Sequence, residues 1–358
     1  WFDNYYFGKK DIFLSSITIT RPIDGHCHLR ENGTMKRTLV DSSNNFSHVV
    51  AMPNLHIPTT SAKLLYEYKS QIDSQLNLLG SNLKILYTLY ASTQLNTQEI
   101  SSCKDDLFAI KLYPQNVTTN AQAGISNLDD IYPLLEMIEE SGIPLLLHGE
   151  TNDPNVDIFD RELIFIDKYL NNWLHRFPQL KVVLEHISTT AAVEFITTST
   201  SNLLAASVTP HHLHANRNSL LANGLKPDYY CLPILKAKAC QEALIEAVTS
   251  GDNRFYLGTD SAPHSQQQKY SSCGCAGIYN SLHAIELYTE IFAEQNALDK
   301  LNDFASTNFA KFHNIESSNE TITLEQSPWI CPTSLPYKIN EFITPFKAGE
   351  KISWKVIT

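Results

Sequence analysis

The sequence predicts an α/β protein built as a (β/α)8 barrel of the TIM type, with a short N-terminal extension and a small C-terminal tail. Short runs of aliphatic and β-branched residues recur along the chain, each followed by a polar loop and a helix-like stretch. Several runs are continuously apolar, which is typical of a parallel sheet buried on both faces. Eight runs in about 240 residues fit such a barrel. An open doubly wound sheet is the alternative, but no glycine-rich phosphate loop follows the first run.

The apolar runs define the expected strands. They cover residues 17–23, 48–52, 84–90, 107–112, 143–147, 181–185, 203–209 and 254–258. Helices are expected between them because apolar residues recur at helical spacing, as Leu65, Tyr68 and Ile72 do within 61–79. The other expected helices cover 128–140, 161–176, 189–199, 236–250 and 280–297.

Changes in this pattern divide the chain into three parts. Residues 1–16 form an N-terminal extension of unassigned role, 17–315 the barrel, and 316–358 a C-terminal tail packed on it. The alternation of strand and helix stops near residue 315, and only short β pieces follow, at 321–324 and 351–357. The first ten residues carry charges and aromatic rings without an apolar segment, so they do not form a secretory signal.

The composition argues against several classes of partner. The chain has 27 basic and 38 acidic residues, and this net charge of −11 argues against nucleic acid or an anionic membrane surface. Its apolar runs are strand-sized, whereas a membrane span needs about 18 residues. Seven cysteines scattered along the chain are typical of reduced thiols. We therefore expect a cytoplasmic protein with a small-molecule substrate.

Metal-binding residue types follow several expected strands, at the end where (β/α)8 barrels carry their active sites. After the first, fifth, sixth and eighth strands the chain places His26, His28, His148, His186 and Asp260. Each alone has a structural explanation, a hydrogen-bonded buried histidine or, for Asp260, a helix cap. Gathered at one rim, however, four imidazoles and a carboxylate would be costly to bury without a partner. A divalent metal ion is such a partner.

Lys111 lies inside the fourth expected strand among apolar neighbours. A lysine in this position either extends to solvent or is buried with a lowered pKa. A buried neutral amine can form a Schiff base or capture CO2 as a carbamate, and a purely structural lysine is the third possibility. Histidines on both sides favour the carbamate, because its anion can bridge two cations.

Seven strings in the same order make the chain resemble the dihydroorotases of the amidohydrolase superfamily, in particular the shorter class II type. They lie at 21–30 (RPIDGHCHLR), 52–54 (MPN), 110–114 (IKLYP), 147–150 (LHGE), 184–186 (LEH), 209–212 (TPHH) and 258–264 (GTDSAPH). The strings at 231–235 (CLPIL) and 271–277 (SSCGCAG) match as well. The resemblance extends from about residue 17 to about residue 350.

The resemblance implies a centre with two Zn²⁺ ions per subunit. It assigns their ligands to His26, His28, Lys111, His148, His186 and Asp260. The first two histidines and Asp260 would bind the more buried ion, and the other two histidines the second. Lys111, as N6-carboxylysine, would bridge the two ions.

The resemblance also implies how the substrate binds. Three side chains would hold its carboxylate, two backbone positions would meet the pyrimidine amides, and two threonines of a mobile lid over 114–124 would reach it. The carboxylate would be held by Arg30, Asn54 and His264. The two backbone positions are Leu232 and Ala276, and the two threonines are Thr118 and Thr119. Arg30 suits this role because in extended backbone it points to the same side as His28. Without the resemblance, a surface ion pair is the alternative for Arg30, and His264 could equally be an exposed loop histidine.

The implied reaction is the reversible cyclisation of N-carbamoyl-L-aspartate to L-dihydroorotate and water, in de novo pyrimidine biosynthesis. Two cations would share a hydroxide and polarise the carbonyl. Asp260 would act as general base and then as general acid toward the leaving nitrogen. The resemblance further implies a homodimer.

Two alternatives remain open from the residues. One is a hydantoinase or allantoinase with the same metals and another ring, and the carboxylate-binding trio argues against it. The other is an inactive relative with a structural or regulatory role, which the six intact ligands argue against.

Two further clusters are expected to be structural. The histidines after the seventh strand, His211, His212 and His214, are expected to support the site without binding zinc. Cys273 and Cys275 form a single Cys-x-Cys without a second pair, so we expect them to shape a loop.

Overall fold

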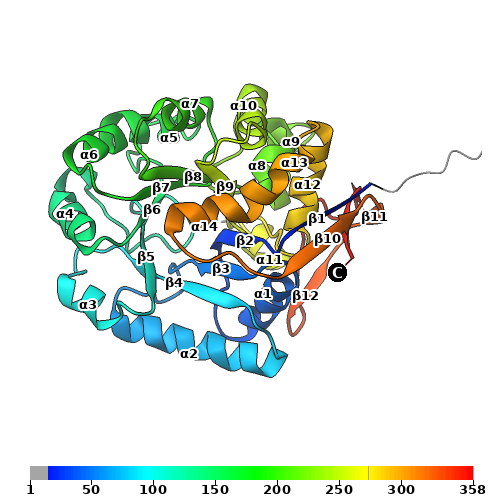
Figure 1. Ribbon diagram of the computed structural model, residues 1–358, viewed down its shortest axis with the longest axis horizontal. Coiled ribbons are helices and arrows are strands. Elements are labelled where there is room, and N and C mark those ends of the chain that lie inside the picture. Colours follow the sequence, from blue (N-terminus) through cyan, green and yellow to red (C-terminus); the bar gives the residue numbers. More distant parts are fainter. Residues whose placement is uncertain (1–14, 273, 358) are drawn as a thin grey trace, which may run out of the picture.

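The computed structural model describes residues 15–272 and 274–357, and eight parallel strands form its centre (Figure 1). Their order in the sheet follows the chain, from β2 to β9. They are β2 (Ile23–Cys27), β3 (His48–Ala51), β4 (Lys84–Tyr90), β5 (Leu107–Leu112), β6 (Leu145–His148), β7 (Val182–Glu185), β8 (Leu204–Val208) and β9 (Phe255–Leu257). A parallel bridge between Cys27 and Ser261 joins the two ends, so the sheet nearly closes. The predicted (β/α)8 barrel is confirmed.

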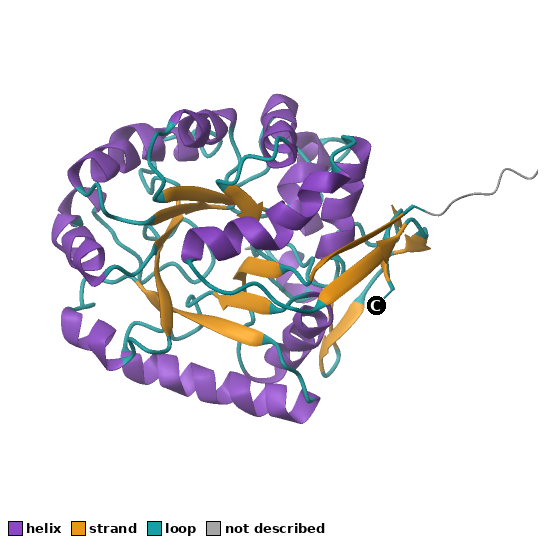
Figure 2. Ribbon diagram, viewed as in Figure 1, coloured by secondary structure: helices purple, strands orange, loops and turns teal. Residues whose placement is uncertain are grey.

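The helices surround the strands (Figure 2). They are α1 (Asn32–Asn45), α2 (Ala62–Leu79), α3 (Thr97–Ser102), α4 (Tyr132–Ser141), α5 (Arg161–Phe165), α6 (Asn171–Arg176), α7 (Thr190–Thr198), α8 (Pro210–His214), α9 (Arg217–Leu221), α10 (Lys238–Thr249), α11 (Gln266–Lys269), α12 (Ala284–Glu294), α13 (Leu298–Asn302) and α14 (Asn308–His313). Shorter turns of 3₁₀ or π type are η1 (Leu128–Asp130), η2 (Ile166–Leu170), η3 (Pro227–Tyr229) and η4 (Asp303–Thr307). Every expected helix overlaps one of these elements.

The strand expected at 17–23 is wrong as the first strand of the barrel. Its residues are divided between β1 (Ser16–Thr20) and β2, and β1 pairs antiparallel with β10 (Thr321–Glu325) outside the barrel. Pro22 separates the two strands, and its missing N–H is why a continuous ladder stops there. β2 itself contains the buried polar residues Asp24 and His26, so no apolar run marked it.

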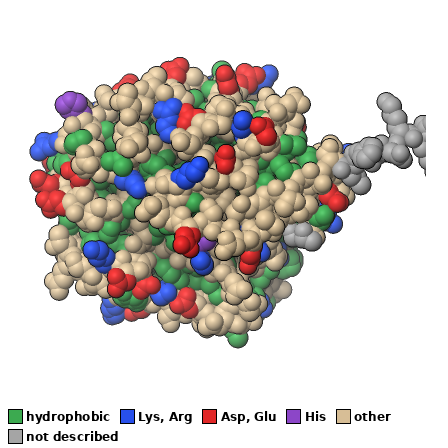
Figure 3. Space-filling view, viewed as in Figure 1, with side chains coloured by type: hydrophobic (Ala, Val, Ile, Leu, Met, Phe, Trp, Pro, Cys, Tyr) green, Lys and Arg blue, Asp and Glu red, His purple; other side chains and the backbone are tan. Residues whose placement is uncertain are grey.

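The tail carries the remaining β structure. β1, β10 and β15 (Lys355–Val356) form one small sheet, whereas β11 (Trp329–Ile330) pairs with β14 (Lys351–Ile352), and β12 (Leu335–Lys338) with β13 (Glu341–Ile343). Of the extension expected over 1–16, residues 1–14 lie outside the described residues. Acidic and basic side chains are interspersed over the face seen in Figure 3. Among the described residues, no helix is both long and apolar enough to cross a membrane.

An apolar layer fills the half of the barrel interior on the side of the N-terminal ends of the strands, called the lower half below. Inward residues of several strands, among them Ala109, Leu146 and Val183, pack there with Tyr256. α14 closes this end with Phe309, whose ring centroid lies 5.1 Å from that of Tyr256. Because side chains alternate along a strand, the next inward positions above this layer carry the residues described below.

Candidate active site

A register shift in β2 turns His26 into the mouth of the barrel. Ile23 packs in the apolar layer, so strict alternation would place Cys27 inside and His26 outside. The pairing of β2 with β3 shifts between Asp24 and Cys27. Such a bulge re-aims the side chains that follow it. As a result His26 lines the cavity, whereas Cys27 packs in the outer core.

Three buried donors converge at the end of β2. The Nε2 atoms of His26 and His28 lie 3.3 Å apart. Asp260 Oδ1 lies 3.2 Å from His26 Nε2 and 3.0 Å from His28 Nε2. All three side chains are buried, and their ligand atoms are close enough to hold one metal ion. The family resemblance assigns these three residues to the more buried ion.

Asp24 supports this group from below, and sequence reasoning did not identify it. One of its oxygens accepts hydrogen bonds from the backbone N–H groups of His26 and Thr259, at 3.1 and 2.8 Å, and the other from the Thr259 hydroxyl at 2.6 Å. Burial raises the pKa of Asp24 to about 6 despite these bonds. Asp24 thus fixes the backbone next to Asp260. Its only sequence signal is an acid two positions before a histidine.

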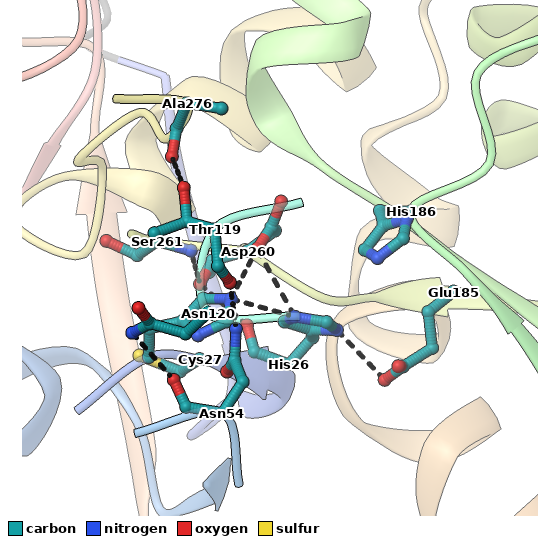
Figure 4. Close-up of polar contacts among 12 residues, drawn as sticks. His26, Cys27, Asn54, Thr119, Asn120, Glu185, His186, Asp260, Ser261 and Ala276 are labelled. Carbon is teal, nitrogen blue, oxygen red and sulfur yellow. Dashed lines mark hydrogen bonds and ion pairs between the residues drawn. The ribbon is translucent and has the colours of Figure 1, made fainter. Parts of the chain in front are cut away.

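Glu185 is a second residue that the sequence analysis missed. It ends β7 fully buried, with Oε1 2.9 Å from His26 Nδ1, as Figure 4 shows. Its other oxygen accepts a hydrogen bond from Lys111 Nζ. Burial opposes ionisation of Glu185, but His26 and Lys111 outweigh it and hold its pKa below the usual value. The signal was an acid at the end of a continuous apolar strand, directly before His186.

His148 and His186 lie side by side on the opposite wall. Their ring centroids are 4.8 Å apart, and that of His186 is 4.9 Å from that of His26. Glu150 Oε2 lies 2.8 Å from His148 Nε2, which leaves Nδ1 of this ring for a cation. The buried Nδ1 of His186 has no hydrogen-bond partner among the described residues.

Lys111 lies at the base of this wall. It is fully buried, and its Nζ is 4.7 Å from the centroid of the Tyr113 ring. Burial lowers the pKa of Lys111, although Glu185 opposes that shift. Burial also lowers the pKa of His148 and His186, and the positive charge of Lys111 adds to both effects. The charge of Lys111 therefore acts on both histidines.

The electrostatics of the mouth favour a bound cation. Burial opposes protonation of His26, but Glu185 and Asp260 outweigh it and raise the pKa of His26 to about 9. In contrast, burial lowers the pKa of His28 to about 4. The negative charges of Glu185 and Asp260, which favour a proton on His26 beside a neutral His28, also attract a metal ion. Nitrogen and carboxylate donors of this kind suit zinc.

Three residues at the mouth have left-handed backbone conformations. φ is 61° at Arg30, 41° at His186 and 43° at Asp260. Such conformations cost energy in residues other than glycine and occur preferentially at functional sites. Here they lie at strand ends and direct these side chains toward the cavity.

The cavity at the mouth is small, with a volume of about 20 Å³. It is lined by His26, His28, Arg30, Asn54, Tyr113, Thr118, Thr119, His148, His186, Leu232, Asp260, Ala262, Ala276 and Gly277. Of the residues expected at the site, only Lys111 and His264 are missing from this lining. His264 lies behind Arg30, with its Nε2 3.1 Å from the guanidinium.

The segment expected to be a lid lies over the cavity. The Asn54 side chain donates a hydrogen bond to the Thr119 carbonyl at 3.1 Å, and the Asn120 side chain donates to the Asn54 carbonyl at 3.2 Å. The Thr119 hydroxyl donates to the Ala276 carbonyl at 3.2 Å (Figure 4). These contacts join the segment to both sides of the mouth.

The other histidines that the sequence singled out have protein partners. His212 bonds to the Thr209 hydroxyl at 2.7 Å and to the Pro233 carbonyl at 3.0 Å. His211 lies 3.2 Å from the Asn280 amide nitrogen, and His214 lies 2.8 Å from the Leu287 carbonyl. None of the three lines the cavity among the described residues. Of the Cys-x-Cys pair, Cys273 lies outside the described residues.

The chain is similar over nearly its whole length to known proteins and solved structures. No family model matches the chain. The dihydroorotase of Coxiella burnetii is 47% identical over 345 residues, which cover 96% of this chain and 98% of that protein. The crystal structure of a dihydroorotase from Campylobacter jejuni is 31% identical and superposes with a TM-score of 0.87 over 96% of this chain and 98% of that one.

A hydantoinase structure is similar to this chain in fold but not in sequence. The L-hydantoinase of Arthrobacter aurescens superposes with a TM-score of 0.79 over 96% of this chain and 83% of that one, but only 14% of residues are identical. It therefore shares the fold alone. Because dihydroorotases are 44–47% identical to this chain over 96% of its length, the chain belongs to the dihydroorotase family, within the amidohydrolase superfamily of barrel enzymes, and is a cyclic amide hydrolase.

Proposed function

We propose that the enzyme catalyses the reversible cyclisation of N-carbamoyl-L-aspartate to L-dihydroorotate and water, a step of de novo pyrimidine biosynthesis. One observation carries the proposal. Buried metal-ligating side chains from β2, β6 and the ends of β7 and β9 meet beside a guanidinium, Arg30, in a single cavity, and Lys111 of β5 is buried next to Glu185 at the end of β7. This combination suits hydrolysis of an amide in a ring that bears a carboxylate.

The donor set fits two zinc ions. His26, His28 and Asp260 would hold one, and His148 and His186 the other. When bound, such a pair supplies Lewis acidity, which lowers the pKa of water toward 7 and polarises a carbonyl. The buried Nδ1 of His186, unpartnered among the described residues, supports this assignment.

Lys111 is proposed to bridge the two ions as a carbamate. Its neutral amine would attack the carbon of CO2, forming an N–C bond and releasing one proton. The anion that results replaces a buried cation. Burial among apolar and aromatic groups favours the neutral amine that this reaction needs. Glu185 would then keep its contact with His26 Nδ1, a common support for a metal-binding imidazole.

Asp260 is proposed as general base and general acid. Burial opposes its ionisation, but His26 and His28 hold the pKa of Asp260 well below its usual value. It is therefore ionised at neutral pH and able to accept the proton of an attacking water. The same proton would pass to the ring nitrogen as the amide bond breaks, and ring closure would reverse these transfers.

Arg30, Asn54 and His264 are proposed to bind the substrate carboxylate. Arg30 and His264 are adjacent, and Asn54 lies at the same mouth under the lid. A guanidinium can hold a carboxylate through two parallel hydrogen bonds. The ring amides would contact the backbones of Leu232 and Ala276, and Thr118 and Thr119 would cover the ring.

The family resemblance also supports a cytoplasmic homodimer. We include this assembly in the proposal, and sedimentation of the purified protein checks it. A mass of two chains is expected, and a mass of one chain would contradict it.

The test of the function compares three cyclic amides as substrates. L-dihydroorotate is expected to turn over at least about 100-fold more efficiently than hydantoin or allantoin, which lack the carboxylate that Arg30 binds. Arg30→Met should raise the KM for dihydroorotate about 100-fold by removing a charged pair. Arg176→Met, on the exposed surface of α6, is the control and should leave KM unchanged. A preference for hydantoin, or an unaltered KM in Arg30→Met, would refute the proposal.

A further inference from the structure

Lys269 is a buried cation that the reaction itself does not use. It ends α11, 5% exposed, and its Nζ donates hydrogen bonds to the carbonyls of Tyr230 at 2.9 Å and Gly277 at 2.7 Å. Burial lowers the pKa of Lys269 to about 8. Burying an ammonium is costly unless its hydrogen bonds are satisfied, so this position requires both carbonyls.

The two carbonyls belong to the two backbone segments assigned to the substrate ring. Tyr230 lies two residues before Leu232, and Gly277 directly follows Ala276. The Gly277 N–H also donates to the Tyr230 carbonyl, at 2.9 Å. One carbonyl thus accepts both from Lys269 and from the opposite segment. Together these bonds set the distance between the two ring-binding segments.

Neither segment has a helix or strand to hold it in place. Residues 230–237, 270–272 and 274–277 are loop and turn. At Gly277, φ is 148°, and an added Cβ would lie 2.7 Å from the Ala262 carbonyl. The loop is therefore packed closely against the segment that follows Asp260. A small displacement there would move the Ala276 backbone relative to Leu232.

α11 connects Lys269 to the proposed carboxylate site. Ser265 begins the helix with a capping box, in which the Ser265 N–H donates to the Gln268 side chain at 3.0 Å. His264 directly precedes this cap, and its Nε2 lies 3.1 Å from the Arg30 guanidinium. Lys269 lies four positions after the cap, at the end of the same short helix.

We propose that Lys269 is a positioning residue that joins the backbones of Leu232 and Ala276 at the spacing required by a ring with two amide groups. The inference rests on the proposed function. It predicts that Lys269 affects binding of the ring and leaves the metal centre alone, because among the described residues its ammonium donates hydrogen bonds to the ring-binding segments and to none of the proposed metal ligands.

The test replaces Lys269 in the full-length enzyme loaded with zinc. Lys269→Met removes the ammonium and keeps the aliphatic stem. The KM for dihydroorotate should rise about tenfold while kcat changes less than about threefold, the signature of lost uniform binding. Zinc content per chain should stay at the wild-type value. Lys269→Arg, which keeps a cation and several donors, should recover most of the KM.

Lys181→Met is the matched control. Lys181 also donates to a backbone carbonyl, that of Phe312 at 2.8 Å, but at the apolar end of the barrel. Its variant should keep the wild-type KM. If Lys269→Met does not fold, Lys269→Gln replaces it, with the same expectation of a raised KM and a retained kcat.

The outcomes separate the inference from the function. If wild type turns over dihydroorotate and Lys269→Met, or Lys269→Gln in its place, keeps the wild-type KM, Lys269 has no positioning role and the function stands. A joint loss of kcat and zinc would also overturn the inference, since it indicates a general structural role. If wild type itself does not turn over dihydroorotate, the proposed function fails and the inference falls with it.

Discussion

The barrel interior has two layers that the same strands supply, an apolar floor and a polar mouth. In β5 and β7 the inward residues of the floor are Ala109 and Val183, which belong to the same apolar cluster as Phe309. Two positions further along, the same strands present Lys111 and Glu185, both fully buried. Both layers are buried, but only the lower one gains free energy from burial itself.

The difference shows where stability and function lie in this molecule. The floor contributes to stability, because its apolar side chains and aromatic rings pack against one another. The mouth holds ionisable groups whose burial is unfavourable without partners, and it also holds the left-handed residues His186 and Asp260. Substitutions in the mouth should therefore change chemistry, and substitutions in the floor should change stability.

Asp260→Asn should give the largest effect on the mouth. The amide cannot accept and return a proton, so kcat should fall about 10²–10⁴-fold. The thermal unfolding midpoint should stay close to that of wild type, because the floor is untouched. Steady-state kinetics and a thermal melt measure both. A kcat within tenfold of wild type would contradict the proposed role.

Phe309→Ala is the corresponding change in the floor. Removing a buried ring should lower the free energy of unfolding by about 3–5 kcal/mol. At low temperature, where the variant stays folded, kcat and KM should be within about twofold of wild type. Phe342→Ala, a ring 45% exposed in the tail, is the control and should cost little. Loss of activity in the folded floor variant would show that the layers are not separable.

Glu150→Gln should sharpen the comparison within the mouth. Glu150 holds His148 Nε2, and removing its charge should weaken metal binding about 10–100-fold. Competition with a chelator gives the metal affinity directly. Glu242→Gln, on the exposed surface of α10, is the control. Equal metal affinity in the two variants would exclude a supporting role for Glu150.

His313 gives the floor a smaller, pH-dependent effect. Burial lowers its pKa from the ordinary value of 6.5 to about 3, and the charge of Lys181 adds to this. Between these values the unfolded chain binds a proton that the native ring does not, so stability falls as pH falls. This contributes up to about 1.4 kcal/mol per pH unit.

Denaturation of His313→Gln at several pH values checks this. The amide can still accept a hydrogen bond from the Tyr256 hydroxyl, which lies 3.1 Å from His313 Nε2. The variant should lose stability less steeply than wild type between pH 6.5 and 4. His175→Gln, exposed on α6, should keep the wild-type slope. An identical slope in both variants would remove His313 from the account.

The sequence predicted most of the barrel because continuous apolar runs report burial on both faces. It missed β2, which contains the buried polar residues Asp24 and His26, and α1, whose buried face includes Thr38, Asp41 and Ser42. The bulge in β2 was also invisible, because nothing local distinguishes it from regular alternation.

For the site, the sequence supplied residues that end strands but few of those that support them. The positions of His148 and Asp260 follow from their strands. Asp24, Glu185 and Lys269 act through partners far away in the chain, and their spacing carries no trace of these contacts. In the sequence, these three residues share one recognisable feature, a charged side chain in a segment that is buried in the fold.

The most direct test of the metal centre is zinc content per chain, measured together with dihydroorotate turnover in wild type and in Lys111→Ala. Wild type should hold about two zinc ions and be active. The variant should lose most turnover, and added short carboxylates such as acetate should restore part of it by occupying the place of the carbamate. Full activity in Lys111→Ala would contradict a centre built around this lysine.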